Sequence, residues 1–524
     1  MIDFLRNNFS IKKNAEDRKK NRSGTKSVVV FDKSNGFREL HTVGVSSDPQ
    51  EIKELHLKAQ EWIDKHVGQL GLDFDQKILN EEKVSSFLDC ISNVLINGTQ
   101  LLINKVFKAV GFDAVKDDIL KSLVTARLAF PASKAATSEY LKSYFNEDIS
   151  LRRIYLYLDR LHSREQKRVE TLSIEHTKKI LGGTLGLIFY DVTTLYFETD
   201  DEDLLRNRGW SKDGKHKNPQ IILGLLVSMG GYPLAYCIYE GNYYEGQSML
   251  PIVKSFVCEH DIKEPITVVA DSGLMNESNM AELERLGYHF ILGARIKNMG
   301  TALKEQILTC PRKKGASIEI PLNGDRRLLV TWSEARAKQD AYNRDKGVKR
   351  LQKAYAKGHL TKEQVNKRGY NKFLDMVGDT TVTINTDRIA EDTKWDGLKG
   401  FITNSNLPSD QVLKSYSDLW RIENAFRISK SKLEIRPIFH FTRERIEAHI
   451  CICFIALKVY KELERRIKLA GIEMSVDKVL DAAKTVTTIQ VKLENSSTVI
   501  SRTMFLTPTH KLIEPLFDDS FWMD

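Results

Sequence analysis

The chain has 524 residues, of which 41% are hydrophobic and 9% aromatic, a composition that supplies a sizeable core and excludes a disordered protein. Its 79 basic and 70 acidic residues leave a net charge of +9, which indicates a nucleic-acid partner only if the excess is concentrated. The six cysteines form no CxxC pair, which argues against a zinc site or a disulfide framework and favours a reducing compartment.

The N-terminal region is basic and then helical in pattern. Residues 1–27 contain 8 basic and 3 acidic residues and lack the apolar stretch of a signal peptide. Residues 27–31 and 40–45 predict a small β-hairpin, and residues 50–180 carry apolar side chains at the three- and four-residue spacing of helices. This helical region is interpreted either as a scaffold or as a domain that recognises DNA ends, since no helix-turn-helix pattern decides between them.

An α/β segment follows, in which two apolar runs each carry a carboxylate toward their C-terminal end. Residues 185–194 predict a buried strand with Asp191 near its C-terminal end, and residues 266–271 predict another that ends on Asp271. Residues 218–239 are uncharged, but their Gly-Gly pair predicts two strands and a turn rather than a membrane helix. The other predicted elements are helices at 248–260 and 277–286 and a strand at 289–294. This order predicts an α/β fold with a ribonuclease-H-like core, in which helices cover a mixed sheet.

Residues 300–400 interrupt that pattern. Residues 317–322 and 327–332 predict a hairpin, and residues 333–372 predict a pair of basic helices with 12 Lys or Arg against 4 Asp or Glu. Such a surplus favours contact with DNA phosphates, although a solvated surface is the alternative. Residues 401–404 are expected to return the chain to the core, before two helices at 408–432 and 442–469.

Asp191 and Asp271 become informative as a pair. The C-terminal ends of strands in an open α/β sheet are where functional sites assemble, and the two proposed strands are neighbours in this fold. Two close carboxylates repel each other unless a cation lies between them, and hard oxygen ligands of this kind suit Mg²⁺ or Mn²⁺.

The helix expected around residues 416–430 carries a third acid. One face of it presents an acid that could bind metal and cations that could hold phosphates, at the positions Tyr416, Leu419, Glu423, Arg427 and Lys430. The alternative is an amphipathic helix on which Glu423 and Arg427 form an ordinary surface ion pair.

With these residues the sequence resembles the DDE transposases of bacterial insertion sequences, in the group marked by Tyr-x2-Arg-x3-Glu-x6-Lys. Tyr416, Glu423 and Lys430 match that signature in register, whereas Leu419 replaces its arginine. Arg421 or Arg427 could take over the phosphate contact of that arginine. The resemblance covers about residues 120–460 and includes FYDVTTLYFE, GWSKDGKHKNPQ, GN followed by Glu245, VVADSG and KWDGLKGFITN.

The resemblance implies a metal-binding catalytic triad of Asp191, Asp271 and Glu423, separated by an inserted subdomain. It implies two Mg²⁺ or Mn²⁺ ions per active site, one activating water or a DNA 3′-hydroxyl and the other stabilising the leaving oxygen. The partners would be the ends of an insertion sequence and a target, both double-stranded DNA, bound by a homodimer on paired ends. Arg427 and Lys430 would neutralise charge on the DNA strand.

Two further functions remain open beside transposition. A transposase-derived protein could bind DNA without cutting it, and a nuclease or resolvase of the same fold could cut DNA without joining a 3′-end to a target. Retention of all three acids favours the enzyme over the binding protein.

Two local features have competing interpretations. GWSKDGKH, at residues 209–216, resembles a phosphate-binding loop but lacks the Ser or Thr and the preceding apolar strand that one requires. Its basic residues Lys212, Lys215 and Lys217 are candidates for DNA contact, with a solvated loop as the alternative. Trp332 ends a strand of the insertion, where some relatives hold a flipped base with an aromatic residue; core packing is the favoured interpretation here.

Together these features predict five regions and a cytoplasmic, nucleoid-associated bacterial enzyme that has no membrane partner. The regions are an N-terminal hairpin with a helical DNA-end-binding part, the first and second parts of the core flanking an insertion, and a C-terminal region: 1–180, 181–299, 300–393, 394–465 and 466–524.

Overall fold

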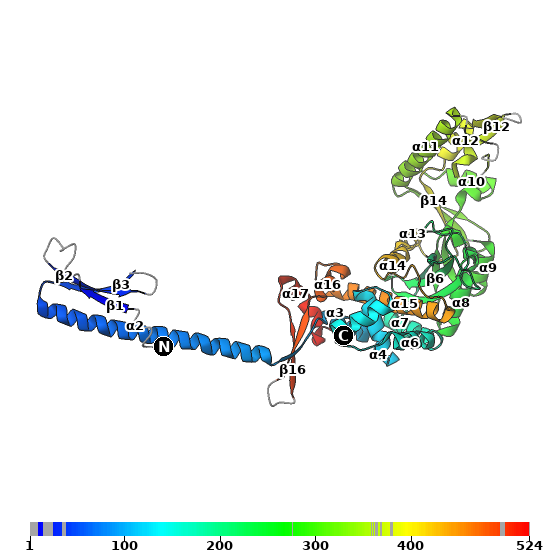
Figure 1. Ribbon diagram of the computed structural model, residues 1–524. Coiled ribbons are helices and arrows are strands. Elements are labelled where there is room, and N and C mark those ends of the chain that lie inside the picture. Colours follow the sequence, from blue (N-terminus) through cyan, green and yellow to red (C-terminus); the bar gives the residue numbers. More distant parts are fainter. Residues whose placement is uncertain are drawn as a thin grey trace. The chain divides into compact units, whose positions relative to one another are not determined.

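The computed structural model describes residues 9–13, 25–33, 38–274, 276–357, 359, 361, 365–366, 369–377, 381–492 and 498–522 (Figure 1). These residues form two compact units. The first comprises residues 1–94 and 489–502, and the second comprises residues 95–488 and 503–524. Within the described residues, no helix is both long and apolar enough to cross a membrane.

The first unit is built on a three-stranded antiparallel sheet and one long helix. The sheet has the order β1 (Phe9–Lys13), β2 (Lys26–Asp32), β3 (Arg38–Ser46), so the expected hairpin exists and a further strand extends it. Helix α2 (Pro49–Asp89) is N-capped by Asp48, whose side chain accepts a hydrogen bond from Gln50 N at 3.0 Å. Alternate valines of β2 pack on the first turns of α2.

A second three-stranded sheet has the order β16 (Val499–Met504), β15 (Thr487–Lys492), β4 (Ile91–Leu95). Strand β4 interrupts the helical pattern predicted for residues 50–180, so that prediction is wrong at residues 91–95. The alternating pattern of partly buried and exposed side chains along β4 is that of a strand.

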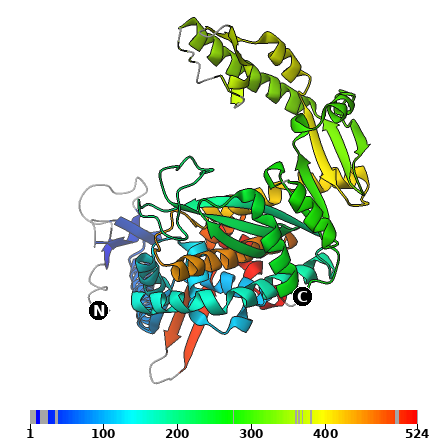
Figure 2. The same ribbon diagram turned by 90° about the vertical axis from the view of Figure 1, so that its right-hand side faces the viewer.

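The second unit contains a bundle of helices around one buried helix. Four helices, α3 (Gly98–Val110), α4 (Asp118–Ala129), α6 (Leu151–Arg164) and α7 (Gln166–Leu181), pack on α15 (Arg443–Leu469), and α5 (Lys134–Phe145) packs on α4 and α6. Most side chains of α15 from Ile446 to Leu463 are buried, so α15 forms the centre of this bundle. Figure 2 shows α15 in orange beside the cyan helices.

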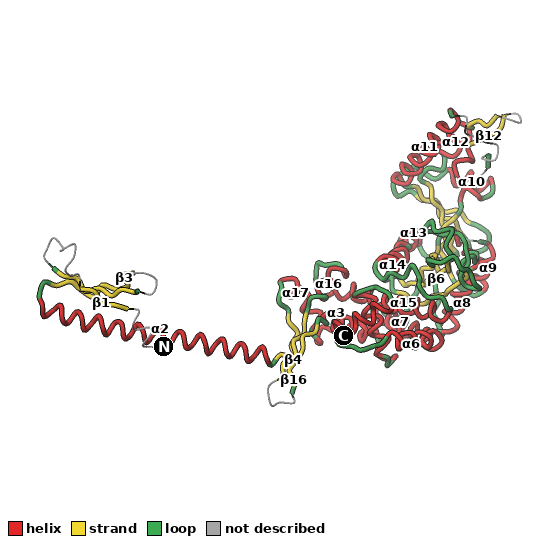
Figure 3. Tube along the Cα trace, in the orientation of Figure 1, coloured by secondary structure: helices red, strands yellow, loops and turns green. Residues whose placement is uncertain are grey.

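The sheet that carries the site has eight strands in the order β10-β11-β14-β9-β8-β5-β6-β7. Strand β5 (Leu187–Tyr196) pairs in parallel with β8 (Thr267–Ala270), and β8 pairs in parallel with β9 (His289–Ala294). On the other side, β6 (Gln220–Ser228) is antiparallel to both β5 and β7 (Pro233–Glu240). The uncharged stretch is therefore the predicted hairpin. The fold is a mixed α/β fold (Figure 3). Along the chain, α8 (Met249–Glu259) connects β7 to β8, and α9 (Glu277–Arg285) connects β8 to β9.

The insertion begins by extending this sheet. Strands β10 (Ser317–Pro321) and β11 (Arg327–Trp332) form the expected hairpin, and β11 pairs with β14 (Leu398–Thr403), which pairs with β9. The prediction that residues 401–404 return the chain to the core is thus confirmed. Figure 2 shows the helical part of the insertion beyond this edge of the sheet. That part contains α11 (Glu334–Ala356), β12 (Leu374–Val377), β13 (Thr381–Ile384) and α12 (Thr386–Thr393), whereas α10 (Thr301–Leu308) shares the hydrophobic cluster of the sheet through Ile307.

Two helix predictions need correction. Only the first of the two helices expected in 333–372 is seen, as α11, while much of 357–368 lies outside the described residues and residues 369–373 form a 3₁₀ turn. The single helix expected at 408–432 is two, α13 (Ser409–Ser417) and α14 (Trp420–Ser431). After α15 come α16 (Val476–Ala483), the strands β15 and β16, α17 (Pro508–Ile513) and two 3₁₀ turns, Glu514–Phe517 and Asp519–Trp522.

Candidate active site

The register of the parallel strands brings the first two acids together. Tyr190 pairs with Ala270 at the last position of the β5–β8 ladder, so Asp191 and Asp271 are the next residues of two neighbouring strands. Asp191 lies in the middle of β5, which continues to Tyr196, and not near its C-terminal end as predicted. The prediction erred because β5 continues beyond β8 by pairing with β6 alone.

Both carboxylates face the same side of the sheet. Successive side chains of a strand alternate between faces, so Asp191 shares a face with Phe189, two residues before it. In the same way Asp271 shares a face with Val269. Phe189 and Val269 belong to one hydrophobic cluster, which also holds Tyr416 and Ile422 of the two helices above. The acids therefore point to the face that α13 and α14 cover.

The third acid, Glu423, comes from a helix that covers this face of the sheet. Glu423 lies in the first turn of α14 and is exposed, while the neighbouring Ile422 is buried and anchors the helix on the sheet. One cavity of about 270 Å³ is lined by all three acids, Asp191, Asp271 and Glu423, together with Lys399 and Tyr416 among others. The three acids predicted from sequence are thus gathered around one cavity.

The environment of Asp191 disfavours its charged form. The pKa of Asp191 is raised to about 6, chiefly by burial and to a smaller extent by the carboxylates of Asp271 and Glu245, against the opposing effect of Lys212. The Lys212 ammonium lies 3.8 Å from Asp191 Oδ1 and 3.5 Å from Glu245 Oε2, and it donates a hydrogen bond to Val192 O at 2.8 Å. Lys212 therefore supplies the positive charge that these carboxylates face.

Tyr416 holds Asp271 in place. Its hydroxyl donates to Asp271 Oδ1 at 3.0 Å, and burial raises the pKa of this phenol, so it remains a hydrogen-bond donor. Gly293 leaves room for this contact, because a Cβ at that position would lie 2.5 Å from the Tyr416 hydroxyl oxygen. The Lys399 ammonium lies 4.4 Å from the centre of the Tyr416 ring.

A family model described as transposase DDE domain matches residues 183–458, more than half of the chain. The chain belongs to this transposase family. The match contains the three acids, the cavity that they line and the whole insertion.

Other known proteins add little to that assignment. No curated protein matches the chain. A solved structure described as the piggyBac transposase synaptic complex with hairpin DNA matches with a TM-score of 0.38 and 10% sequence identity, over 75% of this chain and 80% of that chain.

The signature residues do not share one helical face, contrary to the prediction. Tyr416 belongs to α13, whereas Glu423, Arg427 and Lys430 belong to α14, because the helix ends at Ser417 and begins again at Trp420. Leu419, which replaces the arginine of the signature, is buried in the core and lines the cavity. That turn of the chain consequently presents no cation to the acids.

The predicted DNA-binding cations have different surroundings. Lys430 is 3.1 Å from Asp213, which also contacts Arg436 at 2.6 Å. Arg421 Nε lies 3.4 Å from Asp418 Oδ1, and the exposed Arg427 donates to the side chain of Asn424. The remaining two lie in the exposed loop: Lys215 Nζ is 3.6 Å from Glu198 Oε1, and the side chain of Lys217 is exposed. Their contact with DNA stays a prediction.

Trp332 lies half-buried at the end of β11. Its Nε1 donates to Asp396 O at 3.1 Å, and its ring packs against the cluster on the second face of the sheet. This placement fits the packing interpretation that the sequence favoured.

Sequence reasoning missed Lys399 and gave Glu245 no role beyond the resemblance. Lys399 lies two residues before Phe401 on β14, so strand alternation would have placed it on the face of the acids once β14 was assigned to the sheet. Among the described residues, no three His, Cys, Asp or Glu side chains are already close enough to hold a metal ion. The three acids line one cavity without forming a finished ligand cluster.

Proposed function

We propose that this transposase cleaves DNA at the ends of an insertion sequence and joins the 3′-ends to target DNA, with Asp191, Asp271 and Glu423 as its catalytic acids. The observation that carries the proposal is that these acids, distant in sequence, line one cavity at the end of the β5–β8 ladder. The strand order β7-β6-β5-β8-β9, with β6 alone antiparallel, supports a ribonuclease-H-like core.

The donor set fits a divalent metal. Burial and the neighbouring acids raise the pKa of Asp191, so a cation between the carboxylates would restore its charged form. Carboxylate oxygens suit Mg²⁺ or Mn²⁺. Two such ions, when bound, would supply the positive charge that activates the attacking oxygen and stabilises the leaving oxygen. Lys212 would have to move away from Asp191, since its ammonium now faces that carboxylate.

The chain's own residues then orient the acids and the DNA. Tyr416 fixes one oxygen of Asp271 by its hydrogen bond, which leaves the other oxygen free for a ligand. Lys399 lines the cavity and would neutralise charge on the phosphate that reacts. Glu423, in the first turn of α14, lines the same cavity with an exposed side chain, so it can approach a metal ion together with Asp191 and Asp271.

The proposed partners are double-stranded DNA ends and a target, bound by a homodimer. Lys212, Lys215, Lys217, Arg421, Arg427 and Lys430 are the proposed DNA-contacting cations, with Tyr416 and Trp332 as the aromatic residues nearby.

The test is incubation of the protein with DNA that carries the ends of the element encoding it, with Mg²⁺ or Mn²⁺ and a supercoiled target plasmid. We expect nicks at the element boundary and covalent joining of the 3′-ends to the plasmid, both abolished by EDTA. Cutting without joining would indicate a nuclease or resolvase, and binding without cutting would indicate a transposase-derived DNA-binding protein. Either result would contradict the proposal.

A further inference from the structure

A second cavity adjoins the one lined by the acids. It has a volume of about 530 Å³ and shares Asp271, Lys399 and Tyr416 with the first cavity. Its other walls come from the end of β9, the first three turns of α11 and the loop before β14. A ligand chain that leaves the acids at Asp271 can therefore continue directly into it.

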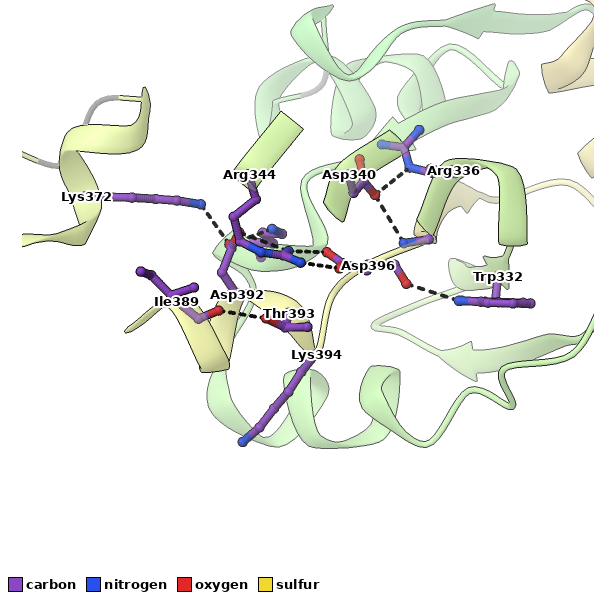
Figure 4. Close-up of polar contacts among 12 residues, drawn as sticks. Trp332, Arg336, Asp340, Arg344, Lys372, Ile389, Asp392, Thr393, Lys394 and Asp396 are labelled. Atoms are coloured by element: carbon purple, nitrogen blue, oxygen red, sulfur yellow. Dashed lines mark hydrogen bonds and ion pairs between the residues drawn. The ribbon is translucent and has the colours of Figure 1, made fainter. Parts of the chain in front are cut away.

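Two acids that line this cavity, Asp392 and Asp396, are already paired with basic side chains. Asp396 accepts two hydrogen bonds from the Arg344 guanidinium, at 2.5 and 2.7 Å. Asp392 contacts Lys297 at 2.8 Å and Lys372 at 2.7 Å. Figure 4 shows the pairs of Arg344 with Asp396 and of Lys372 with Asp392. These acids consequently have little remaining capacity for another cation.

The wall beside Asp271 carries three cations, Arg295, Arg336 and Lys399, and direct ion pairs there are few. Within the described part of the chain, Arg295 makes no ion pair, and its guanidinium donates only to Gly273 O at 3.4 Å. Lys399 forms no ion pair within 4.0 Å there either. Arg336 Nε is 3.7 Å from Asp340 Oδ2, an acid that already accepts a hydrogen bond from Gly397 N.

These three cations lie on the side toward the acids. Burial and, after it, the positive charge of Arg336 lower the pKa of Lys399, against the opposing effect of the Asp271 and Glu423 carboxylates. Three cations at one wall repel one another unless an anion lies between them. Three cations therefore line the wall that adjoins the acid cavity, and within the described residues their one ion pair is that of Arg336 with Asp340.

We propose that this second cavity binds the DNA phosphodiester adjacent to the scissile one, through Arg295, Arg336 and Lys399. The inference rests on the proposed function, since it takes the acid cavity as the place where the scissile phosphate binds. A phosphate group offers the charge and the acceptor oxygens that two guanidinium groups and an ammonium require. The insertion thereby has a role in the reaction, because Arg336 of α11 would bind a phosphate of the DNA strand that is cut.

The experiment measures DNA binding with Glu423→Gln protein, so that binding is observed without cleavage. Duplexes carrying the element end contain one neutral methylphosphonate, placed at each phosphate around the cleavage position in turn. Arg336→Gln and Lys399→Met are introduced singly, with Lys338→Gln as the matched control. Lys338 lies on the same helix but pairs with Glu334 at 2.7 Å in an exposed position and does not line the cavity.

We expect Arg336→Gln to weaken binding of unmodified DNA about tenfold and to reduce the slope of log K against log salt by about one. The methylphosphonate next to the scissile position should weaken binding of the parent protein by a similar factor and cause no further loss in the Arg336 variant. Lys338→Gln should change neither quantity. Circular dichroism of each variant separates loss of contact from loss of folding.

Two results would overturn this inference while leaving the proposed function intact. One is that Arg336→Gln weakens binding by the same factor whichever phosphate is neutralised. The other is that a methylphosphonate next to the scissile position does not weaken binding of the parent protein. If the parent protein neither binds nor cuts the element ends, the proposed function itself fails.

Discussion

The substitution Asp191→Asn tests whether the charged carboxylate of Asp191 lowers the free energy of unfolding. The pKa of Asp191 is raised from 3.8 to about 6, so its charged form is disfavoured in the folded protein. The sign follows directly: below pH 3.8 the carboxyl is protonated in both states and costs nothing, and stability is lost as the pH rises from 3.8 to about 6. Asparagine resembles the protonated form at every pH.

The size of the effect follows from the shift. A shift of about two pKa units corresponds to roughly 3 kcal/mol of unfolding free energy above pH 6, at about 1.4 kcal/mol per unit. We therefore expect Asp191→Asn to be more stable than the wild type at pH 8 by up to about 3 kcal/mol. Near pH 4 the two proteins should be nearly equal. A catalytic acid would then be a residue that lowers stability in order to serve function.

The assay is thermal or urea unfolding of both proteins at pH 4 and pH 8, with EDTA present. Addition of Mg²⁺ at pH 8 should then stabilise the wild type and leave Asp191→Asn unchanged, because ligand binding to the folded state raises its stability. An Asn variant that is equally or less stable than the wild type at pH 8 would refute the account of Asp191 as a strained, buried carboxylate.

Three other substitutions test neighbouring contacts. Tyr416→Phe removes the hydrogen bond to Asp271, a contact with a charged group worth about 1.5–3 kcal/mol, so the Mg²⁺ concentration for half-maximal nicking should rise about tenfold or more; an unchanged value would contradict the orienting role. Asp213→Ala should free Lys430 and strengthen DNA binding at low salt, whereas weaker binding by gel shift would show that the ion pair is needed to shape the loop. Glu462→Ala leaves the buried guanidinium of Arg466 on α15 without its carboxylate partner and should lower the unfolding free energy by about 3–5 kcal/mol, and a loss below 1 kcal/mol in urea unfolding would contradict this.

The sheet and its acids could be predicted because each strand is a single apolar run. Asp191 and Asp271 follow such runs, and parallel neighbours bring equivalent positions together. The extent of β5 beyond Asp191 could not be predicted, since it depends on pairing with β6 and not on the residues of β5 alone.

The break between α13 and α14 had no signal in the sequence. The stretch Ser417–Trp420 contains neither Gly nor Pro, and the hydrophobic spacing continues through it. The helix ends there in a tertiary context, with Leu419 buried in the core and the Tyr416 hydroxyl directed at Asp271.

The second cavity was also beyond sequence reasoning. Arg295, Arg336 and Lys399 come from β9's end, α11 and β14, and they meet only because the insertion extends the same sheet. In the sequence, Arg336 was one basic residue among many, and Lys399 lay in a motif quoted only for the resemblance.

The most direct test of the central claim is strand cleavage by Glu423→Ala beside Glu444→Ala. Both glutamates are exposed in the first turn of a helix, but only Glu423 lines the acid cavity. On DNA carrying the element ends with Mg²⁺ or Mn²⁺, Glu423→Ala should bind as the wild type does and lose nicking at the boundary, while Glu444→Ala should cut normally. Boundary nicking that persists in Glu423→Ala would contradict the account, because the third acid of the site would then lie elsewhere.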